Sequence, residues 1–443
     1  MRQPFFALRP HVPVLIAYNN HCRERGQIMA GIIFHIDVNS AYLSWTAVER
    51  LARGDTVDLR LIPAVIGGDA ATRHGVVLAK SLPAKAFGVQ TGEPVAQALK
   101  KCPDLLLVPP DHKLYHRRSR ELMALLREYT PDIEQVSVDE CYMDFTPIAH
   151  RFSSPAAAAA EIRAHVREKL GFTVNIGISS VKVLAKMASD FEKPDKTHTL
   201  FPDELEKKLW PLPVRELFSV GGSTAARLAT LGVRTIGDLA SCSPGLLESH
   251  FKSHGRQIWE YAHGIDDSAV VTEREEAKSI GNSTTLREDV ATEAEADRIL
   301  LELAESVSAR LRKNHLLAGC VAVEIKYSTF VKVSRQTAVY SPTDSTNAIH
   351  ETACRLFAEL WNGEPLRLLG LRATRLVGEN APVQLSLFDM DWQALRKKET
   401  ATAVRKPDAE KQRKLEQALD AIKNRYGRDA VVRGSQLGKP DDA

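Results

Sequence analysis

Residues 136–144 read Val136-Ser137-Val138-Asp139-Glu140-Cys141-Tyr142-Met143-Asp144, and this stretch decides the fold. It sets two adjacent carboxylates, Asp139 and Glu140, between runs of alternating apolar residues that predict short strands over 133–138 and 141–145. The two carboxylates then fall at or beside a tight hairpin turn, exposed at the edge of a sheet. Because adjacent like charges repel each other unless a cation binds, the pair indicates a cation site.

A third carboxylate, Asp37, ends the apolar run 32–36, which predicts a buried central strand of the same sheet. Asn39-Ser40 follows, and we expect these residues to cap a helix over 41–51 that ends near Gly54. A strand followed by a helix places Asp37 at the carboxyl end of its strand.

The elements around these carboxylates predict a ferredoxin-like α+β domain. Strands 62–66 and 76–80 and a helix over 94–101 form a small β-rich insert after the first helix. A basic amphipathic helix (111–130), the carboxylate hairpin, an alanine-rich helix (154–170) and a strand (173–178) complete the order β-α, insert, α-ββ-α-β.

Two further modules and a tail follow. Residues 197–272 predict short helices around a glycine turn at Gly221-Gly222, where Ser223 caps a helix that stops near Gly232. Such turns present N–H groups to phosphate.

Residues 277–377 predict a second α/β module with helices 293–314 and 347–361 and strands 320–327, 331–340 and 367–377. The tail from residue 381 is polar, with a charged helical stretch over 408–426 that has no core of its own. For the basic stretch 396–433 we expect a solvated helix, with added nucleic-acid affinity as the alternative.

Length, charge and cysteine content limit the number of domains, the kind of nucleic-acid surface and the compartment that we expect. A chain of 443 residues suggests about two to four domains. Its net charge of +3 is the remainder of 59 basic and 56 acidic residues, so a nucleic-acid surface must come from local clustering. Six cysteines without a CxxC pair favour reduced thiols in a cytoplasmic protein, and we expect no structural metal.

The chain shows no apolar stretch of about 18 residues, so we expect no membrane span. We expect residues 1–29 to be a poorly ordered extension rather than a signal peptide, and we hypothesise that Met29 is an alternative start.

Taken together, the motifs resemble those of Y-family DNA polymerases of the DNA polymerase IV (DinB) type, and the resemblance covers nearly all of residues 31–388. It rests on Asp37-Val38-Asn39-Ser40-Ala41-Tyr42, the block over 80–89, Ser137-Val138-Asp139-Glu140, the stretch 177–186 and the glycine hairpin at 219–223. The domains implied are a palm (30–54 and 104–196), fingers (55–103), a thumb with a helix-hairpin-helix (197–272), a little finger (277–378) and a tail (379–443).

Phosphodiester synthesis by in-line displacement uses two divalent cations about 3.5–4 Å apart, which three carboxylates suit. The resemblance implies that Asp37, Asp139 and Glu140 are the catalytic metal ligands, that the backbone carbonyl of Val38 completes the nucleotide-side site, and that the ions are two Mg²⁺. The alternative is an ordinary solvated turn at Asp139-Glu140, with Asp37 as a helix cap.

The resemblance also assigns residues that handle the nucleotide. Tyr42 would be the steric gate that excludes a ribose 2′-hydroxyl, with a half-buried core tyrosine as the alternative. Lys85 and Lys182 would contact the triphosphate, with solvated surface lysines as the alternative. This chain has Leu82-Pro83-Ala84-Lys85 where the family usually has Tyr-Glu-Ala-Arg, so a tyrosine hydroxyl is missing and an arginine fork is replaced by one ammonium group.

The remaining assignments concern DNA and a partner protein. Gly221 and Gly222 would grip the DNA backbone, although Ser219 and Gly222 stand where a glycine and a lysine are common, and a plain αα-corner is the alternative. Lys326, Lys332 and Arg335 would hold DNA on the little-finger sheet, or else lie on a solvated face. In the tail, Gln384-Leu385-Ser386-Leu387-Phe388 resembles the peptide that docks on the bacterial sliding clamp; its hydrophobic members are Leu385, Leu387 and Phe388.

These assignments predict a monomeric, template-directed DNA polymerase that binds primer-template DNA, deoxynucleoside triphosphates and the clamp. The resemblance implies low-fidelity translesion synthesis. The rivals are a non-catalytic, clamp- and DNA-binding accessory protein of the same fold and a plain helix-hairpin-helix DNA-binding protein.

Overall fold

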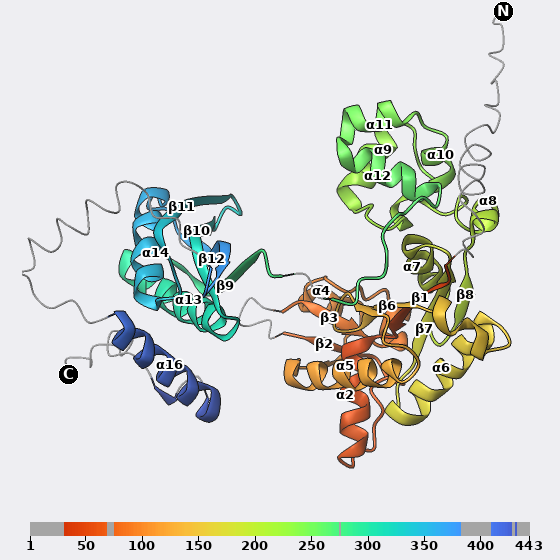
Figure 1. Ribbon diagram of the computed structural model, residues 1–443, viewed down its shortest axis with the longest axis horizontal. Helices are drawn as coiled ribbons and strands as arrows, with labels where there is room; N and C mark the ends of the chain where they lie inside the picture. The colour runs from red at the N-terminus through yellow and green to blue at the C-terminus, as the bar shows by residue number, and fades with distance from the viewer. Residues whose placement is uncertain (1–30, 69–74, 274–275, 382–408, 428–429, 432–443) are drawn as a thin grey trace, which may run out of the picture. The chain divides into compact units, whose positions relative to one another are not determined.

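The computed structural model describes residues 31–68, 75–273, 276–381, 409–427 and 430–431 (Figure 1). These residues form two compact units, one built from 31–68 and 76–273 and the other from 276 onward. Each unit is described by itself.

The first unit contains a five-stranded sheet in the order β5-β6-β1-β7-β8. Its strands are β1 (Ile33–Val38), β5 (Ile133–Gln135), β6 (Glu140–Asp144), β7 (Val174–Ser179) and β8 (Thr197–Thr199). Neighbouring strands are antiparallel except β7 and β8, which are parallel. The first four strands have the ferredoxin-like order that the sequence predicts, and β8 extends the sheet by one strand.

Side chains along β1 alternate between the two faces of this sheet, one of which is covered by the main core and the other by α7. Phe34 and Ile36 are buried in the core that also contains residues of α2 (Ala41–Ala52), α5 (His112–Arg127) and α6 (Pro155–Leu170). His35 and Asp37 point the other way, toward α7 (Lys182–Asp190), because successive side chains of a strand alternate between faces. Figure 1 shows α7 on the opposite side of the sheet from α2, α5 and α6.

Helix α7 lies unusually close to the sheet at Gly177 of β7. A Cβ atom at this position would collide with the carbonyl oxygen of Ala185 and the amide nitrogen of Ser189, both backbone atoms of α7. The absence of a side chain at Gly177 therefore sets the separation between this helix and the sheet. Gly177 also lies directly opposite His35 in the β1–β7 ladder.

The expected cap of α2 is wrong in its chemistry. Ser40 occupies the N-cap position in a left-handed conformation, with φ of 49°, and its side chain makes no cap hydrogen bond. Instead, the hydroxyl of Ser44 donates to the carbonyl of Asn39 at 2.6 Å, within the first turn of the helix.

The insert forms a separate small sheet in the order β3-β2-β4. Its elements are β2 (Ala64–Gly67), β3 (Val77–Lys80), α3 (Leu82–Ala86), α4 (Val95–Lys101) and β4 (Leu106–Val108). Helix α3 is not among the predicted elements; Ser81 begins it, because the Ser81 hydroxyl accepts a hydrogen bond from the amide of Ala84 at 3.1 Å.

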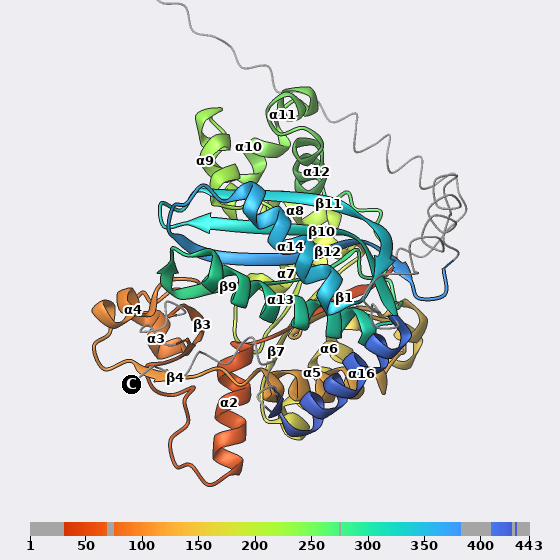
Figure 2. The same ribbon diagram turned by 90° about the vertical axis from the view of Figure 1, so that its left-hand side faces the viewer.

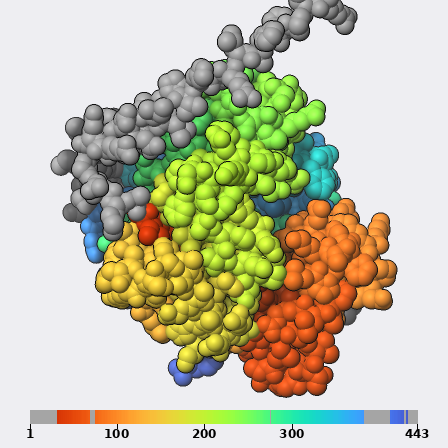
Figure 3. Space-filling view, turned by 90° about the vertical axis from the view of Figure 1, so that its right-hand side faces the viewer, coloured from red at the N-terminus to blue at the C-terminus, as the bar shows by residue number. Residues whose placement is uncertain are grey.

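The helical module of the first unit follows β8. Its main helices are α8 (Leu205–Lys208), α9 (Gly222–Thr230), α10 (Ile236–Ala240), α11 (Pro244–Phe251) and α12 (Ser253–Ala262). They share one core with Val183, Leu184 and Met187 of α7, so the module is packed on the helix that covers the five-stranded sheet. In Figure 3 the segment that contains α7 and the helical module form one continuous surface.

The glycine turn of this module differs from the prediction. Gly221, not Ser223, is the N-cap of α9, and Ser223 lies inside the helix. Ser219 adopts a left-handed conformation with φ of 74°, which glycine adopts more readily than serine. The His254 ring nitrogen Nε2 lies 3.2 Å from the Ser219 hydroxyl and 3.1 Å from its carbonyl, which helps to hold this conformation.

The second unit is a four-stranded antiparallel sheet in the order β11-β10-β12-β9. The strands are β9 (Ser279–Val290), β10 (Leu316–Tyr327), β11 (Lys332–Thr343) and β12 (Leu366–Gly378). Helices α13 (Glu293–Lys313) and α14 (Thr346–Leu360) pack across one face of it (Figure 2). The edge strand β9 is not among the predicted elements.

Helix α16 (Ala409–Tyr426) is docked on the second unit, and the expectation of a solvated helix is wrong. The guanidinium of Arg312 on α13 is buried and lies 2.7 Å from both Glu416 and Asp420 of α16. Glu416 is only 2% exposed and also accepts from the amide of Thr346. Polar side chains therefore attach this helix to the domain.

Among the residues that the structure describes, no helix combines the length and apolar character that a bilayer crossing requires.

Candidate active site

The structure brings the three predicted carboxylates together. Asp37 lies directly opposite Glu140 in the β1–β6 ladder. The amide of Val38 donates to the carbonyl of Asp139 at 3.1 Å, which places Asp139 beside the end of β1. All three acids therefore gather at the edge of the sheet where β1 ends and β6 begins.

The loop before Glu140 is held by one hydroxyl. Ser137 Oγ donates to Asp139 Oδ1 at 2.6 Å and accepts from the amides of Asp139 and Glu140 at 3.2 and 3.0 Å. The expected strand 133–138 is shorter, because β5 ends at Gln135 and this hydroxyl-centred turn replaces the ladder.

Two lysines that the sequence analysis missed neutralise the carboxylates. Lys186 Nζ lies 2.5 Å from Glu140 Oε1 and 3.4 Å from Asp37 Oδ2, and Lys193 Nζ lies 2.8 Å from Asp37 Oδ2. Lys186 is four residues after Lys182 on α7, so helical spacing was an available signal that they share a face. Donors of opposite charge thus already compensate the repulsion among the acids.

These contacts shift the ionisation of the groups involved. Burial alone would lower the pKa of Lys186, but the carboxylates of Asp190, Asp37 and Glu140 outweigh it and raise that pKa above its usual value. Burial raises the pKa of Glu140, with Lys186 opposing this effect.

A buried histidine lies beneath the acids. His35 Nδ1 is 2.8 Å from the hydroxyl of Ser189 on α7, and its ring packs edge-on against Tyr142 with centroids 4.8 Å apart. Burial, followed by the charges of Lys186 and Lys193, holds the pKa of His35 well below its usual value. The ring is therefore neutral at physiological pH.

Tyr42 lies on the first turn of α2, close to Asp139. Its ring stacks on Tyr115 with centroids 4.3 Å apart and an interplanar angle of 6°. Burial, the charge of Asp139 and Tyr115 raise the pKa of Tyr42. The ring is partly exposed and fixed in orientation by a buried neighbour.

The two predicted triphosphate lysines have different surroundings. Lys182, whose side chain is 11% exposed, lies 2.7 and 2.9 Å from the carboxylate oxygens of Glu134 and over the ring of Tyr142. Lys85 is exposed in the last turn of α3, on the insert. Burial, and then the charge of Lys85, lower the pKa of nearby Lys80.

The donor set matches hard divalent cations. Asp37, Asp139 and Glu140 supply carboxylate oxygens, and Val38 offers a backbone carbonyl at the same strand end. Oxygen-only donors of this kind favour Mg²⁺ over softer metals. The positions taken by the Lys186 and Lys193 ammonium groups show that the acids attract positive charge.

The predicted DNA contacts are distributed over both units. A Cβ atom at Gly221 or Gly222 would meet nothing within 4 Å, so the start of α9 is open to a ligand's approach. In the second unit, Lys326 and Lys332 are paired across β10 and β11 and share the face opposite the helices, where Lys332 also pairs with Glu324 at 2.8 Å.

Arg335 lies on the other face of that sheet. It is three residues beyond Lys332 and pairs with Glu359 of α14 at 2.8 Å, so the structure does not group it with the two lysines. Arg372 of β12 is opposite Ala322 and therefore shares the open face, although the sequence analysis did not single it out. The clamp-like peptide Gln384–Phe388 and residues 1–29 lie outside the described residues.

Comparisons with known proteins agree with this architecture. The impB/mucB/samB family model matches residues 36–190, its C-terminal domain matches 277–387, and the helix-hairpin-helix motif of the same family matches 202–233. DNA polymerase IV of Clostridium acetobutylicum is 43% identical over 413 residues, which cover 93% of this chain and 100% of that protein. DNA polymerase IV 1 of Bacillus subtilis is 36% identical, over 93% of this chain and 94% of its own length.

A solved structure supports the fold. A Y-family DNA polymerase chimera of Dbh and Dpo4 superposes with a TM-score of 0.66 and 21% identity, covering 78% of this chain and 99% of the chimera. The palm, fingers, thumb and little-finger architecture is thereby confirmed. The chain belongs to the impB/mucB/samB family and is a DNA-directed DNA polymerase of the Y family, DNA polymerase IV type.

Proposed function

We propose that this polymerase extends primers by in-line phosphoryl transfer with two Mg²⁺ ions held by Asp37, Asp139, Glu140 and the carbonyl of Val38. The observation that carries the proposal is the meeting of three carboxylates at one sheet edge, where Lys186 and Lys193 supply positive charge. Bound cations would lower the pKa of the primer 3′-hydroxyl and neutralise the triphosphate.

The chain's own residues orient the reactants. Ser137 fixes the Asp139 carboxylate through its hydroxyl, so this ligand is preorganised. Lys186 and Lys193 must leave the acids, or share them, when metal binds. Their alkyl chains are long enough to swing toward solvent or toward a phosphate oxygen.

Nucleotide selection is assigned to residues around the acids. Tyr42, held flat by Tyr115, acts as the steric gate against a 2′-hydroxyl. Lys182 and Lys85 bind triphosphate oxygens, and Lys182 exchanges its ion pair with Glu134 for the phosphate. Lys85 provides a single ammonium in place of an arginine fork, so it contributes charge without bidentate geometry.

DNA is held through its backbone by two surfaces. The N–H groups at Gly221 and Gly222 receive a phosphate at the thumb. Lys326 and Arg372 present positive charge on the open face of the little-finger sheet, and Lys332 adds to it when it leaves Glu324, with which it pairs at 2.8 Å. Arg335 contributes only if it leaves Glu359.

The cellular role follows from the same assignment. We infer translesion synthesis of low fidelity by a monomer that is recruited to the sliding clamp through Gln384, Leu385, Leu387 and Phe388. Two leucines and a phenylalanine in a polar linker are suited to a hydrophobic pocket on a partner.

Primer extension tests the central assignment. Wild type and Asp139→Ala are compared with Mg²⁺ and four deoxynucleotides on intact and damaged templates, with the exposed carboxylate variant Asp203→Ala as control. We expect Asp139→Ala to bind primer-template normally and to lose extension by at least about 100-fold, or ~2.7 kcal/mol. Extension at the wild-type rate by Asp139→Ala would refute the metal-ligand assignment. Wild-type extension that stops at every lesion would refute the translesion role alone.

A further inference from the structure

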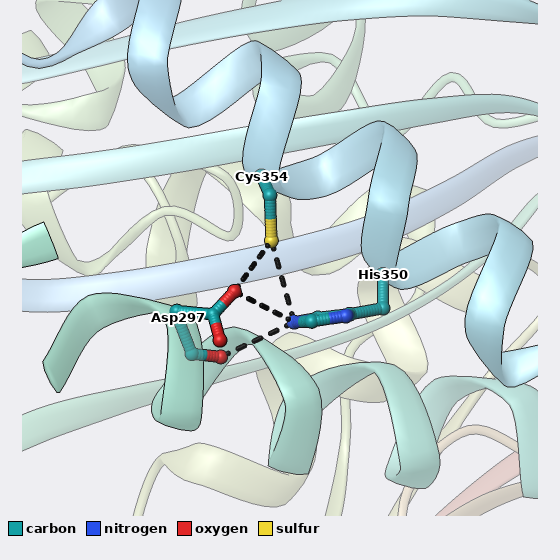
Figure 4. Close-up of side chains that lie close together, drawn as sticks. All are labelled: Asp297, His350 and Cys354. Carbon is teal, nitrogen blue, oxygen red and sulfur yellow. Dashed lines mark hydrogen bonds and ion pairs between the residues drawn. The ribbon is translucent and has the colours of Figure 1, made fainter. Parts of the chain in front are cut away.

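Three side chains with metal-binding atoms converge on the second unit, far along the sequence from the catalytic carboxylates. They are Asp297 on α13 and His350 and Cys354 on α14 (Figure 4). The Cys354 Sγ atom lies 3.0 Å from Asp297 Oδ1 and 3.3 Å from His350 Nε2, and these last two atoms are 3.2 Å apart. The three atoms form a nearly equilateral triangle.

Local structure explains the convergence. His350 and Cys354 are four residues apart on one helix and therefore project from the same face. That face borders α13, whose first turns present Asp297. The carbonyl of Asp297 also lies 3.3 Å from His350 Nε2, so this ring nitrogen is directed at the cluster.

We propose that Asp297, His350 and Cys354 form a binding site for a divalent transition metal ion, Zn²⁺ being the ion that this donor set suits best. A thiolate, an imidazole and a carboxylate are together the ligands of tetrahedral zinc, whereas Mg²⁺ and Ca²⁺ prefer oxygen alone. Water would complete the fourth position, because Asp297 is 54% exposed and solvent reaches the cluster.

The size of the triangle supports an ion. Tetrahedral zinc with bonds of about 2.0–2.3 Å separates such ligand atoms by roughly 3.3–3.6 Å. The observed separations of 3.0 to 3.3 Å are a few tenths of an ångström shorter. Small rotations of the exposed Asp297 side chain would open the triangle enough for the ion to sit just outside its plane.

Binding would change the protonation of the cluster in a defined way. The thiol of Cys354, which donates to Asp297, would lose its proton to solvent as the sulfur–metal bond forms. No electron transfer is involved. The ion would link two helices whose ligands are 53 and 57 residues apart in sequence, and would stabilise the little finger by mass action.

The absence of a CxxC pair and of a recognisable ligand spacing had favoured the expectation of no structural metal. The spacing His350-x-x-x-Cys354 contains one cysteine only, and its third ligand comes from another helix. The cluster shares no residue with the proposed polymerase site, so either proposal can fail without the other.

Cobalt spectroscopy tests the site in the full-length protein, because a cobalt–thiolate bond gives an ultraviolet charge-transfer band that carboxylate sites cannot give. Metal-free protein is titrated with Co²⁺ and then with Zn²⁺. Wild type should show the band with one equivalent of Co²⁺, and Zn²⁺ should abolish it. Cys354→Ser should lack the band, while the matched control Cys242→Ser, which removes a partly exposed thumb thiol, should retain it.

Two further variants examine the other ligands. Asp297→Asn and His350→Ala should each weaken Co²⁺ binding by at least about tenfold, which is the smallest effect expected even for loss of an outer-shell partner. Thermal melting in chelator checks that each variant is folded, and Zn²⁺ should raise the melting temperature of wild type and Cys242→Ser but not of Cys354→Ser. Absence of the band in folded wild type, or its persistence in Cys354→Ser, would overturn the proposal.

Discussion

Asp37 and Glu140 face each other across the β1–β6 ladder, and a single ammonium group, that of Lys186, contacts both carboxylates. This lysine places positive charge at the carboxylates that would hold the proposed Mg²⁺ ions. Lysine and metal should therefore compete for the same acids.

This competition predicts the behaviour of Lys186→Met. Without metal, the variant should unfold more easily by about 1.5–3 kcal/mol, because a charged hydrogen bond is lost and the acids are left to repel each other. Mg²⁺ should then raise its melting temperature more than it raises that of wild type. Thermal melting with and without Mg²⁺ measures both effects, and Lys196→Met, at a half-exposed lysine, is the control. If Mg²⁺ raised the melting temperature of Lys186→Met and of wild type equally, competition between Lys186 and the metal would be contradicted.

The gate assignment predicts a sugar-specific effect at Tyr42. Tyr42→Ala should increase ribonucleotide insertion relative to deoxynucleotide insertion by at least about tenfold, or 1.4 kcal/mol, because the ring that fills the 2′ position is removed. Tyr42→Phe keeps the ring and its stacking on Tyr115, and should keep the discrimination. Single-nucleotide insertion kinetics with both sugars provide the measurement. Unchanged discrimination in Tyr42→Ala would show that the ring is only a core residue.

The ion pair between Lys182 and Glu134 predicts opposite effects of its two members. Lys182→Ala should raise the KM for the incoming nucleotide by about tenfold, since one phosphate contact of roughly 1.4 kcal/mol is lost. Glu134→Gln should leave KM unchanged or lower it, because Lys182 is released for the phosphate. Steady-state kinetics at saturating primer-template separate these outcomes. If both substitutions raised KM, the ion pair itself would be the functional element.

The buried Arg312 predicts that α16 can be detached. Arg312→Ala leaves Glu416 buried without its partner and should destabilise the second unit by about 3–5 kcal/mol. Hydrogen exchange should then become fast throughout α16. Arg298→Ala, on the exposed side of the same helix α13, is the matched control and should leave exchange unchanged. Slow exchange in Arg312→Ala would mean that other contacts dock the helix.

The buried His35 predicts how stability depends on pH. Its pKa is lower in the folded protein than the value of about 6.5 expected in the unfolded chain, so the unfolded chain binds a proton first as pH falls. Stability should be constant above about pH 6.5 on this account. Below it, stability should fall by up to ~1.4 kcal/mol per pH unit until the folded-state pKa is reached.

Urea unfolding in the presence of a chelator, measured across this window, gives the slope. His35→Gln can keep a hydrogen bond to Ser189 but does not titrate. The free energy of unfolding of this variant should therefore depend less steeply on pH, by the amount that corresponds to about one proton fewer taken up on unfolding. An identical slope in wild type and variant would assign the acid sensitivity to other groups.

The parts of the fold that sequence predicts are those with a local period. The strand that ends at Asp37 and the helix that carries Tyr42 follow from alternation and helical spacing. Strand β9 does not, because Ser279–Val290 is largely polar and is a strand only because it pairs with β12.

In the candidate active site, too, sequence predicts the residues that lie in local patterns and not those that meet only through tertiary packing. The three carboxylates could be assigned from the sequence because Asp37 ends a predicted strand, Asp139 and Glu140 lie at or beside a predicted hairpin turn, and the motifs around them resemble those of Y-family polymerases. Lys186 and Lys193 were missed because their charges meet Asp37 only after α7 has packed on the sheet. Likewise, the burial of Arg312 depends on Glu416, which is 104 residues away, and no local pattern reports such a contact.

Gly177 determines how closely α7 and its side chains approach the sheet that carries Asp37. Helix α7, which carries Lys182, Lys186 and the Ser189 partner of His35, can approach the sheet only because no side chain stands between them. A methyl group at position 177 would push away the charges that face Asp37 without touching any reacting atom. A saturation screen for lost polymerase activity should therefore recover substitutions at position 177 as well as at the acids. Gly177 contributes to activity only because it has no side chain, which leaves room for α7.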